Sequence, residues 1–291
     1  MKISELFDKR GTVLSFEVFP PKPNADEAVI YEALDRLSVL RPDFISVTYG
    51  AGGGKNGEKT VQIAADLKNK YGIESAAHLP CTGINEEEAV KILDEFKEKG
   101  IENILALRGD ISSDTVIKGR FSHANELIEF IKERYDFNVI AACYPEGHSE
   151  SKSIAEDIHN LKRKTDSGAS HLITQLFLDN RYFYEFRERA AIAGINVPIS
   201  AGIMPVTNKA QIERMVELCG ISLPKKFMKI IERYENDPVA LRDAGIAYAV
   251  DQIVDLISCD TDGIHIYTMN NYQTARRIYE AVHKLLNVKS C

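Results

Sequence analysis

The chain has 291 residues, of which 36 are basic and 43 acidic, so its formal net charge is −7. With 44% hydrophobic and 27% charged residues, it can bury a full core, and its length suits one large domain such as an α/β barrel of about 250 residues. A nucleic-acid partner would need a basic face, so this acidic balance leads us to expect none.

Several classes of protein are excluded by what the chain lacks. No apolar run approaches the roughly 20 residues that span a bilayer, and the first ten residues have no apolar core typical of a signal peptide. The five cysteines form no C-x-x-C pair, a pattern typical of a reducing compartment. The histidines show no metal-ligand spacing. We therefore expect a cytoplasmic protein with no membrane span and no metal site.

Short β-branched or small apolar runs alternate with amphipathic stretches of helical length along the whole chain. The runs predict strands near residues 13–19, 44–48, 75–79, 103–107, 138–143, 172–177, 198–203 and 263–267. The stretches predict helices near residues 26–40, 59–71, 86–99, 122–134, 151–167, 181–193 and 272–286. A longer helical stretch, 208–258, follows the seventh strand and is broken by Pro224 and Pro238.

Residues at the helix boundaries support this assignment. Asn85 precedes three glutamates, which places a capping side chain and negative charge at a helix start. Glycines suited to C-terminal caps end four helical stretches: Gly72, Gly100, Gly168 and Gly194. Eight strand–helix units without a linker predict an α/β fold, a single (β/α)8 TIM barrel over residues 1–291 with extra helices between strands seven and eight. A doubly wound open sheet is the alternative.

In a β/α barrel, catalytic residues lie at the carboxyl ends of the strands. The polar residues predicted there are Glu17, Thr48, His78, Arg108, Tyr144, Thr174, Gln175, Tyr267 and Thr268. No lysine lies at a strand end, which argues against a Schiff-base enzyme.

Glu17 is the clearest candidate among them. Alternation along the first strand turns Leu14, Phe16 and Val18 toward the helices, so Ser15 and Glu17 point into the barrel. Burial of a carboxylate raises its pKa, which suits a general acid at neutral pH. A buried ion pair with a lysine or arginine is the alternative.

The other strand-end residues each have a structural alternative. Asp110 follows Arg108 and Gly109, and it could belong to a site or to an ordinary turn in which it pairs with Arg108. His78 could be a hydrogen-bonded core histidine. Thr48 could hydrogen-bond its own backbone.

Two further patterns have alternative explanations. Asp157, Asn160, Arg163 and Lys164 recur at helical spacing, so their shared face could bind a diphosphate ligand or be solvated surface. The run Gly52–Gly57 fits G-x-G-x-x-G, so an NAD-dependent Rossmann dehydrogenase is an alternative function. The match is weak because the next strand does not end in an acidic residue, and the Walker A pattern fails.

An ordered set of motifs covers essentially the whole chain. The motifs are SFEVFPPK (15–22), VTYGAGG (47–53), AHL (77–79), LRGD (107–110), YPEGH (144–148), NLKRK (160–164), ITQLF (173–177), GIMPV (202–206) and YTMN (267–270). Each motif alone is modest, but the ordered set is specific. It resembles the methylenetetrahydrofolate reductase family.

The resemblance implies a flavin-containing β/α barrel that reduces 5,10-methylenetetrahydrofolate to 5-methyltetrahydrofolate. It implies that Glu17 is the general acid that protonates N10 and opens the five-membered ring. It also implies that Asp110 stabilises the resulting iminium beside the flavin, so that hydride passes from reduced FAD to the folate. The substrate-binding residues implied are Glu17, Thr48, Asp110, Gln175 and Gln211, with Gln175 and Thr48 contacting folate or nicotinamide in alternate turns.

The resemblance further implies FAD as the cofactor and NADH or another electron donor as a partner. The implied FAD contacts are Thr48, His78, Arg108, Gly109, Asp110, Phe121, Ser122, Tyr144, His148, Asp157, Asn160, Arg163 and Lys164. The polar helix face thus becomes a cofactor surface, and the glycine run becomes a strand-to-helix loop.

Three features depart from the family. Asn271 stands where well-known bacterial relatives have arginine, and Met215 stands where they have an aromatic residue against which nicotinamide would stack. The second departure motivates an alternative, a flavin-bearing subunit that receives electrons from ferredoxin or a partner subunit. A homo-oligomer is the other expected assembly. The chain also ends after the eighth helix, so we expect no regulatory domain and no inhibition by adenosylmethionine.

Overall fold

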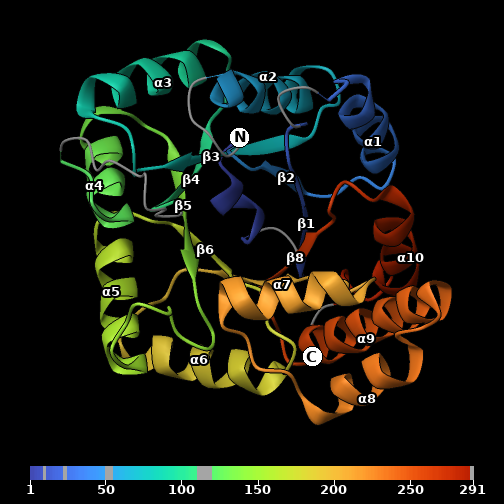
Figure 1. Cartoon of the computed structure of the whole chain (residues 1–291). Coiled ribbons are helices and arrows are strands. Elements are labelled where there is room, and N and C mark those ends of the chain that lie inside the picture. Colours follow the sequence, from blue (N-terminus) through green and yellow to red (C-terminus); the bar gives the residue numbers. More distant parts are fainter. Residues whose placement is uncertain (9–10, 22–24, 50–54, 110–119, 289–291) are drawn as a thin grey trace.

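Eight parallel strands close into a barrel in the computed structural model, which describes residues 1–8, 11–21, 25–49, 55–109 and 120–288 (Figure 1). The strands are β1 (Val13–Val18), β2 (Phe44–Val47), β3 (Glu74–Pro80), β4 (Asn103–Leu107), β5 (Asn138–Cys143), β6 (His171–Thr174), β7 (Ile199–Ile203) and β8 (Gly263–Tyr267). They pair in chain order, and β8 closes the barrel on β1. The predicted barrel is confirmed, and the doubly wound open sheet is wrong.

Helices surround the barrel and connect successive strands. They are α1 (Ala28–Ser38), α2 (Lys55–Asn69), α3 (Glu86–Glu98), α4 (Ala124–Arg134), α5 (Ile154–Asp166), α6 (Asn180–Ile192), α7 (Lys209–Cys219), α8 (Lys225–Tyr234), α9 (Pro238–Ser258) and α10 (Tyr272–Val282). Among the helices of the described ranges, none is long and apolar enough to cross a bilayer.

The extra helices predicted between strands seven and eight are α7, α8 and α9, which lie together beside α6 and α10 (Figure 1). Both prolines act as predicted. Pro224 is the N-cap residue of α8 and Pro238 is the first residue of α9, where its missing N–H costs no helical hydrogen bond. At Gly245 of α9, a Cβ atom would lie 1.7 Å from the carbonyl oxygen of Val206, so only glycine allows this helix to approach the loop after β7.

Side chains alternate between the two faces of the barrel, as the sequence predicts. Leu14, Phe16 and Val18 of β1 are buried in the main hydrophobic core, which joins the strands to the surrounding helices. Ser15 faces inward and contacts the His265 side chain of β8. The barrel therefore has a core outside its wall and a mixed polar and apolar interior.

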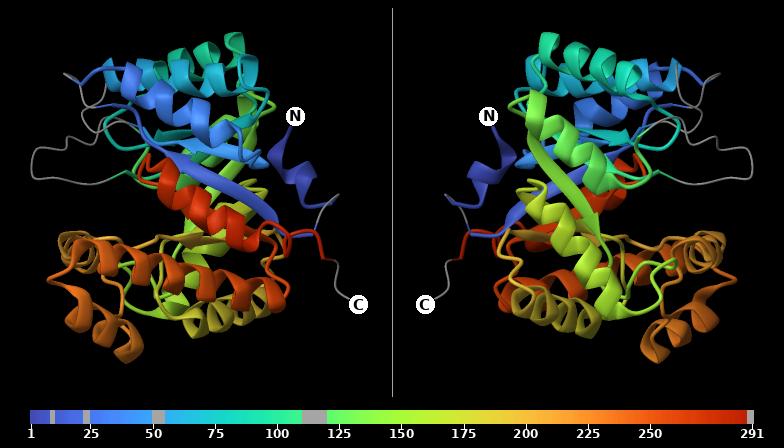
Figure 2. Two further views of the ribbon diagram at one scale, coloured as in Figure 1. Left: turned by 90° about the vertical axis from the view of Figure 1, so that its right-hand side faces the viewer. Right: turned by 90° about the vertical axis from the view of Figure 1, so that its left-hand side faces the viewer.

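A short 3-10 helix, η1 (Ile3–Leu6), closes the amino end of the barrel. Ile3 and Leu6 pack there with inward residues such as Phe44, and the Ile3 N–H donates to Asn103 Oδ1 at 2.8 Å. Figure 2 shows this helix on the opposite side of the molecule from α7 and α8. The carboxyl end of the barrel is thus the end available to a ligand.

Candidate active site

Glu17 lies inside the carboxyl end of the barrel, as predicted. Its Oε2 atom is 3.5 Å from His78 Nε2 and 3.7 Å from His265 Nε2, and its side chain is 20% exposed. Within the described ranges, two imidazoles face this carboxylate and no lysine or arginine pairs with it. Among the residues that the structure describes, the alternative of an ion pair with a lysine or arginine is not found, and two histidines lie beside the carboxylate instead.

The predicted direction of the Glu17 pKa shift is wrong for the protein by itself. Burial acts to raise this pKa, but a hydrogen bond with His265, the charges of His78 and His265, and a hydrogen bond with Ser46 together outweigh it. The pKa of Glu17 is lowered below its usual value, so the chain alone stabilises the carboxylate.

His78 is both a buried histidine and a neighbour of the candidate acid. Its side chain is largely buried, and desolvation lowers its pKa to about 4, although the charge of Glu17 acts in the opposite direction. His78 is therefore neutral at pH 7, so its ring can serve as a hydrogen-bond partner without adding a full charge to the site.

His265 is a residue of the site that sequence reasoning missed. Its Nδ1 lies 2.7 Å from Ser15 Oγ and its Nε2 lies 3.4 Å from Ser46 Oγ. The signal was present in β8, because Ile264 and Ile266 face the outer core and the residue between them must point inward. His265 links β1, β2 and β8 at the level of Ser15, on the amino-end side of Glu17.

A second cluster of polar side chains lies near the carboxyl end of the barrel. It is formed by residues after β4 and β5 and on the inner face of α5. The Tyr144 and His148 rings meet edge to face at 4.6 Å, and Lys164 Nζ lies 5.6 Å from the Tyr144 ring centroid. Lys164 Nζ also donates to Ala142 O at 2.9 Å, and burial lowers its pKa. The buried Asp157 accepts a hydrogen bond from Ser151 at 2.9 Å.

Arg108 pairs with Glu150 through two hydrogen bonds, and the Nη2–Oε1 distance is 3.0 Å. The pKa of the Arg108 guanidinium is raised, and the largest cause is its hydrogen bonding to Glu150. Its Nε atom is buried without a hydrogen-bond partner in the structure. Asp110, the predicted second catalytic carboxylate, lies outside the described residues, so neither its site role nor its pairing with Arg108 is tested.

Gly109 occupies a position that only glycine fits easily. Its φ is +89°, and a Cβ atom there would lie 2.6 Å from Thr82 Oγ1. The Thr82 hydroxyl and backbone N–H both donate to the Arg108 carbonyl oxygen, at 2.7 and 2.9 Å. The loop after β4 is thereby fixed to the loop after β3.

Other predicted cofactor residues have structural roles in the described chain. The Phe121 side chain is buried against Phe130, with ring centroids 5.1 Å apart, so a ligand contact at this residue falls to its backbone. The Ser122 N–H donates to Glu126 at 2.6 Å. Arg163 is exposed on α5, whereas Asn160 is half-buried. The polar face of α5 is thus narrower than its sequence spacing indicates.

Thr48 and Gln175 lie at the ends of β2 and β6, as predicted. The Thr48 N–H donates to Val18 O at 3.0 Å, and its carbonyl oxygen accepts from Thr60 at 2.9 Å. Gln175 Oε1 accepts from the Leu176 N–H at 2.9 Å, which leaves the Gln175 NH2 group as a donor for a ligand.

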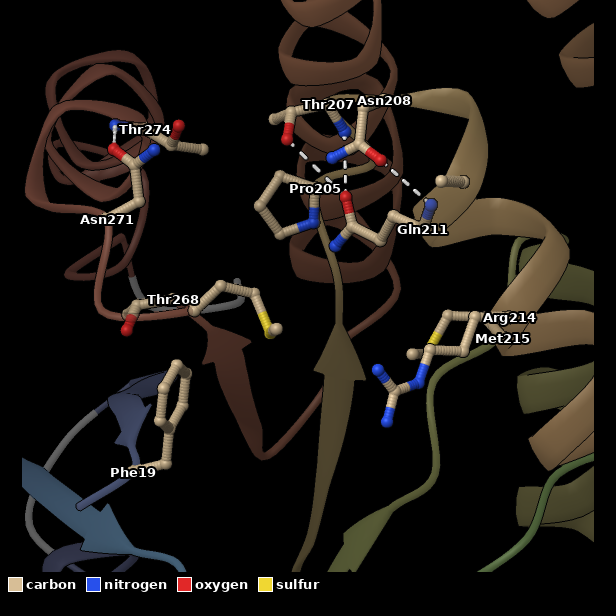
Figure 3. Close-up of a pocket in the computed structure, with 12 residues that line it drawn as sticks. Phe19, Pro205, Thr207, Asn208, Gln211, Arg214, Met215, Thr268, Asn271 and Thr274 are labelled. Carbon is tan, nitrogen blue, oxygen red and sulfur yellow. Dashed lines mark hydrogen bonds between the residues drawn. The ribbon is translucent and has the colours of Figure 1, made fainter. Parts of the chain in front are cut away.

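A cavity of about 580 Å³ opens between the loops after β7 and β8, and Figure 3 shows the residues that line it. Gln211 lines it, and its Oε1 accepts from the Thr207 N–H at 3.1 Å. Met215 also lines it. Asn271 lines the opposite wall, where its Oδ1 caps α10 by accepting from the Thr274 N–H at 3.1 Å. A cavity of this size can hold a ligand of several rings.

The run Gly52–Gly57 begins outside the described residues. Its last part lies in α2, which starts at Lys55, and a Cβ atom on Gly57 would lie 2.3 Å from the Tyr49 hydroxyl. The closed barrel removes the open-sheet crevice that a Rossmann site needs. The Rossmann interpretation of this run is therefore wrong.

The chain is similar to known proteins along almost its whole length. The sequence pattern of the family described as methylenetetrahydrofolate reductase matches residues 2–283. A 5,10-methylenetetrahydrofolate reductase from Pectobacterium carotovorum is 36% identical over 265 residues, covering 91% of this chain and 88% of the relative. The enzyme of the same name from Escherichia coli is 35% identical over 272 residues, covering 94% and 90%.

A solved structure shares the fold at low identity. It is a Clostridium thermocellum protein described as binding two copies of 5-methyl-5,6,7,8-tetrahydrofolic acid, with a TM-score of 0.63, 12% identity, and coverage of 98% of this chain and 99% of that one. This likeness supports the barrel, while the sequence relatives identify the family. The chain belongs to the methylenetetrahydrofolate reductase family.

Proposed function

We propose that this chain reduces 5,10-methylenetetrahydrofolate to 5-methyltetrahydrofolate, with residues 1–291 acting as a single FAD-binding barrel domain. Family membership supports the reaction. The observation that carries the proposal is the placement of Glu17 beside a ligand-sized cavity. Thr268 lines that cavity, and its hydroxyl group donates a hydrogen bond to the Glu17 backbone carbonyl oxygen at 2.6 Å.

The residues around the ends of β4 and β5 fit FAD. Arg108 has a buried Nε without a hydrogen-bond partner, and Lys164 is a half-buried amine that donates to the Ala142 carbonyl oxygen. These are donors suited to the oxygens of a diphosphate, and the Tyr144 ring offers an aromatic surface beside them. We propose that Arg108, Tyr144, His148 and Lys164 hold the cofactor. Bound FAD supplies the hydride for the reduction.

Glu17 is proposed as the general acid for N10. Protonation of this amine makes it a competent leaving group and yields an electrophilic iminium carbon on the folate. In the protein by itself, the pKa of Glu17 is lowered, so the acid must gain its proton as the site fills. Ligands covering the exposed 20% of its side chain add desolvation, which raises the pKa in the required direction.

Two further residues are proposed to act on the substrate. Asp110 follows Gly109 in sequence and would place a negative charge near the iminium, which stabilises the cation. Gln175 would orient the pterin through its NH2 group, because its Oε1 is engaged by the Leu176 N–H. Thr48 and Gln211 are proposed as further polar contacts to the substrate.

The electron donor is proposed to be NADH, bound at the same mouth in alternation with folate. A second candidate is a partner subunit or ferredoxin. Met215 favours this second candidate, because the thioether that lines the cavity offers no aromatic face to a nicotinamide ring. Anaerobic mixing of the yellow protein with NADH separates the two, since rapid flavin bleaching in the isolated chain supports direct reduction.

The replacement Glu17→Gln tests the assigned acid. We expect folate reduction to fall about 10²- to 10⁴-fold, because an amide cannot donate the proton, while flavin content and flavin reduction remain. Stopped-flow absorbance of the flavin measures both half-reactions. Glu232→Gln, at an exposed position on α8, is the matched control. Normal folate reduction by the Glu17→Gln variant would show that the acid is assigned wrongly.

A further inference from the structure

Among the described residues, 12 line the cavity and one of them, Arg214, is charged. The other described lining residues have apolar, hydroxyl or amide side chains. No carboxylate is among them. In Figure 3 the Arg214 guanidinium extends from α7 into the open space on the side facing Phe19.

The Arg214 charge is uncompensated among the described residues. None of their hydrogen bonds or ion pairs involves Arg214, whereas Lys209, on the same helix, pairs with Glu235 at 2.6 Å. A guanidinium offers five N–H donors in a planar fork suited to carboxylate and phosphate oxygens. In a protein with a net charge of −7, such a group is a local attraction for anions.

The cavity that Arg214 lines borders the end of β1 next to Glu17. Phe19 lines the cavity and is two residues beyond Glu17, and Thr268 lines it while bonding to the Glu17 carbonyl oxygen. Arg214 lies on the other wall, on α7 (Figure 3). A ligand whose reacting end is at Glu17 can therefore extend along the cavity and bring an anionic end to Arg214.

We propose that Arg214 binds the carboxylates of the glutamyl tail of the folate substrate. This inference rests on the proposed function and adds to it a residue that determines tail recognition. Asn271 on the facing wall is neutral, and its Oδ1 is used to cap α10, so it supplies no charge for this role. The diphosphate of a nicotinamide donor presents similar oxyanions, so the test must separate the two sources.

The experiment compares two ligands with the FAD-loaded protein. One is 5-methyltetrahydrofolate with a single glutamate, and the other is 5-methyltetrahydropteroate, which lacks it. For Arg214→Gln, we expect the Kd of the glutamate form to rise about 10- to 100-fold, because charge-assisted hydrogen bonds are lost. The Kd of the pteroate form should change less than about twofold. Arg214→Lys should recover part of the affinity.

Two controls complete the test. Arg233→Gln removes the same charge from an exposed position on α8 outside the cavity lining, and it should leave both Kd values unchanged. Raising the salt concentration should weaken glutamate-form binding in the wild type more than in Arg214→Gln, because screening acts on the charge. Circular dichroism and flavin absorbance check that each variant is folded and loaded.

The outcomes separate the inference from the function beneath it. Equal losses for both ligands, or no loss for either, would overturn the role of Arg214 while the proposed function stands. A raised KM for NADH with unchanged folate binding would also overturn it, since the anion bound would then be the donor diphosphate. If wild-type protein neither binds 5-methyltetrahydrofolate nor reduces the methylene form, the proposed function fails and this inference fails with it.

Discussion

The two ends of the barrel each contain a buried histidine, but their surroundings differ. At the amino end, His171 lies between the Phe7 and Phe44 rings, with centroids 4.5 and 6.0 Å away, and its Nε2 is 2.9 Å from Ser200 Oγ. Near the carboxyl end, His78 faces the Glu17 carboxylate at 3.5 Å. The same residue type thus supports packing at one end and polarises a candidate acid at the other.

His265 lies between these two environments. Its ring stacks on the ring of Phe44, a residue of the amino-end cluster, with the two centroids 6.1 Å apart. Its Nε2 lies 3.7 Å from Glu17 Oε2. The apolar layer below therefore fixes the orientation of a ring that acts on the site above. The comparison predicts that changes at the amino end alter stability, whereas changes at the carboxyl end alter chemistry.

The largest stability effect is expected at the η1 helix. Ile3→Ala removes a fully buried side chain from the amino-end cluster and should cost about 2–5 kcal/mol of unfolding free energy. Urea unfolding measures this loss, and Val29→Ala, at a side chain that is 63% exposed, is the matched control. Activity per folded molecule should stay unchanged. A lower kcat in folded Ile3→Ala protein would break the proposed division between the two ends.

A further effect on stability, of similar size for each of two histidines, is expected from pH. Desolvation by burial lowers the pKa of His78 to about 4 and that of His171 to about 3, so the unfolded chain binds more protons between these values and 6.5. The contribution of these two histidines to the free energy of unfolding is therefore fully present above about pH 6.5. It is lost as the pH drops, by about 3 kcal/mol for each histidine near pH 4.5.

The replacement His171→Asn should flatten this dependence. Asparagine can retain a hydrogen bond to Ser200 but does not titrate, so one of the two contributions disappears. Urea unfolding of wild type and variant at pH 7.0, 5.5 and about 4.5 measures the difference in slope. Equal slopes for the two proteins would show that His171 is not the group that takes up the proton.

The barrel could be predicted from the sequence because its signals are local. Strand alternation and helix-cap residues are sufficient to predict all eight strands. The predicted sixth strand, however, runs to residue 177, whereas β6 ends at Thr174. The reason is that Leu176 and Leu178 continue the apolar run after the chain has left the barrel wall. They pack in a separate cluster with Met204 and Val206 beside the extra helices.

The sequence was sufficient to predict that Glu17 points into the barrel, but not to predict the pKa of its carboxyl group. Alternation alone placed Glu17 inside the barrel, but its pKa depends on His265, which is 248 positions away in the sequence and adjacent only after β8 closes on β1. The sequence was equally insufficient to predict that Arg214 is an isolated charge in the cavity. Sequence spacing places Arg214 on a helix, but it does not show that the other described residues lining the cavity are neutral.

The smallest effect is expected at Asn271, which tests whether a polar residue at the carboxyl end can be purely structural. Asn271→Ala removes the cap of α10 and should cost about 1 kcal/mol of stability. The KM for folate should change less than about threefold, because the Asn271 side chain is engaged by its own helix. Asn85→Ala, which removes the corresponding cap of α3 outside the cavity lining, is the matched control for stability. A tenfold rise in the folate KM for Asn271→Ala alone would place this residue among the ligand contacts, and Arg214 would then share recognition of the folate tail with the facing wall of the cavity.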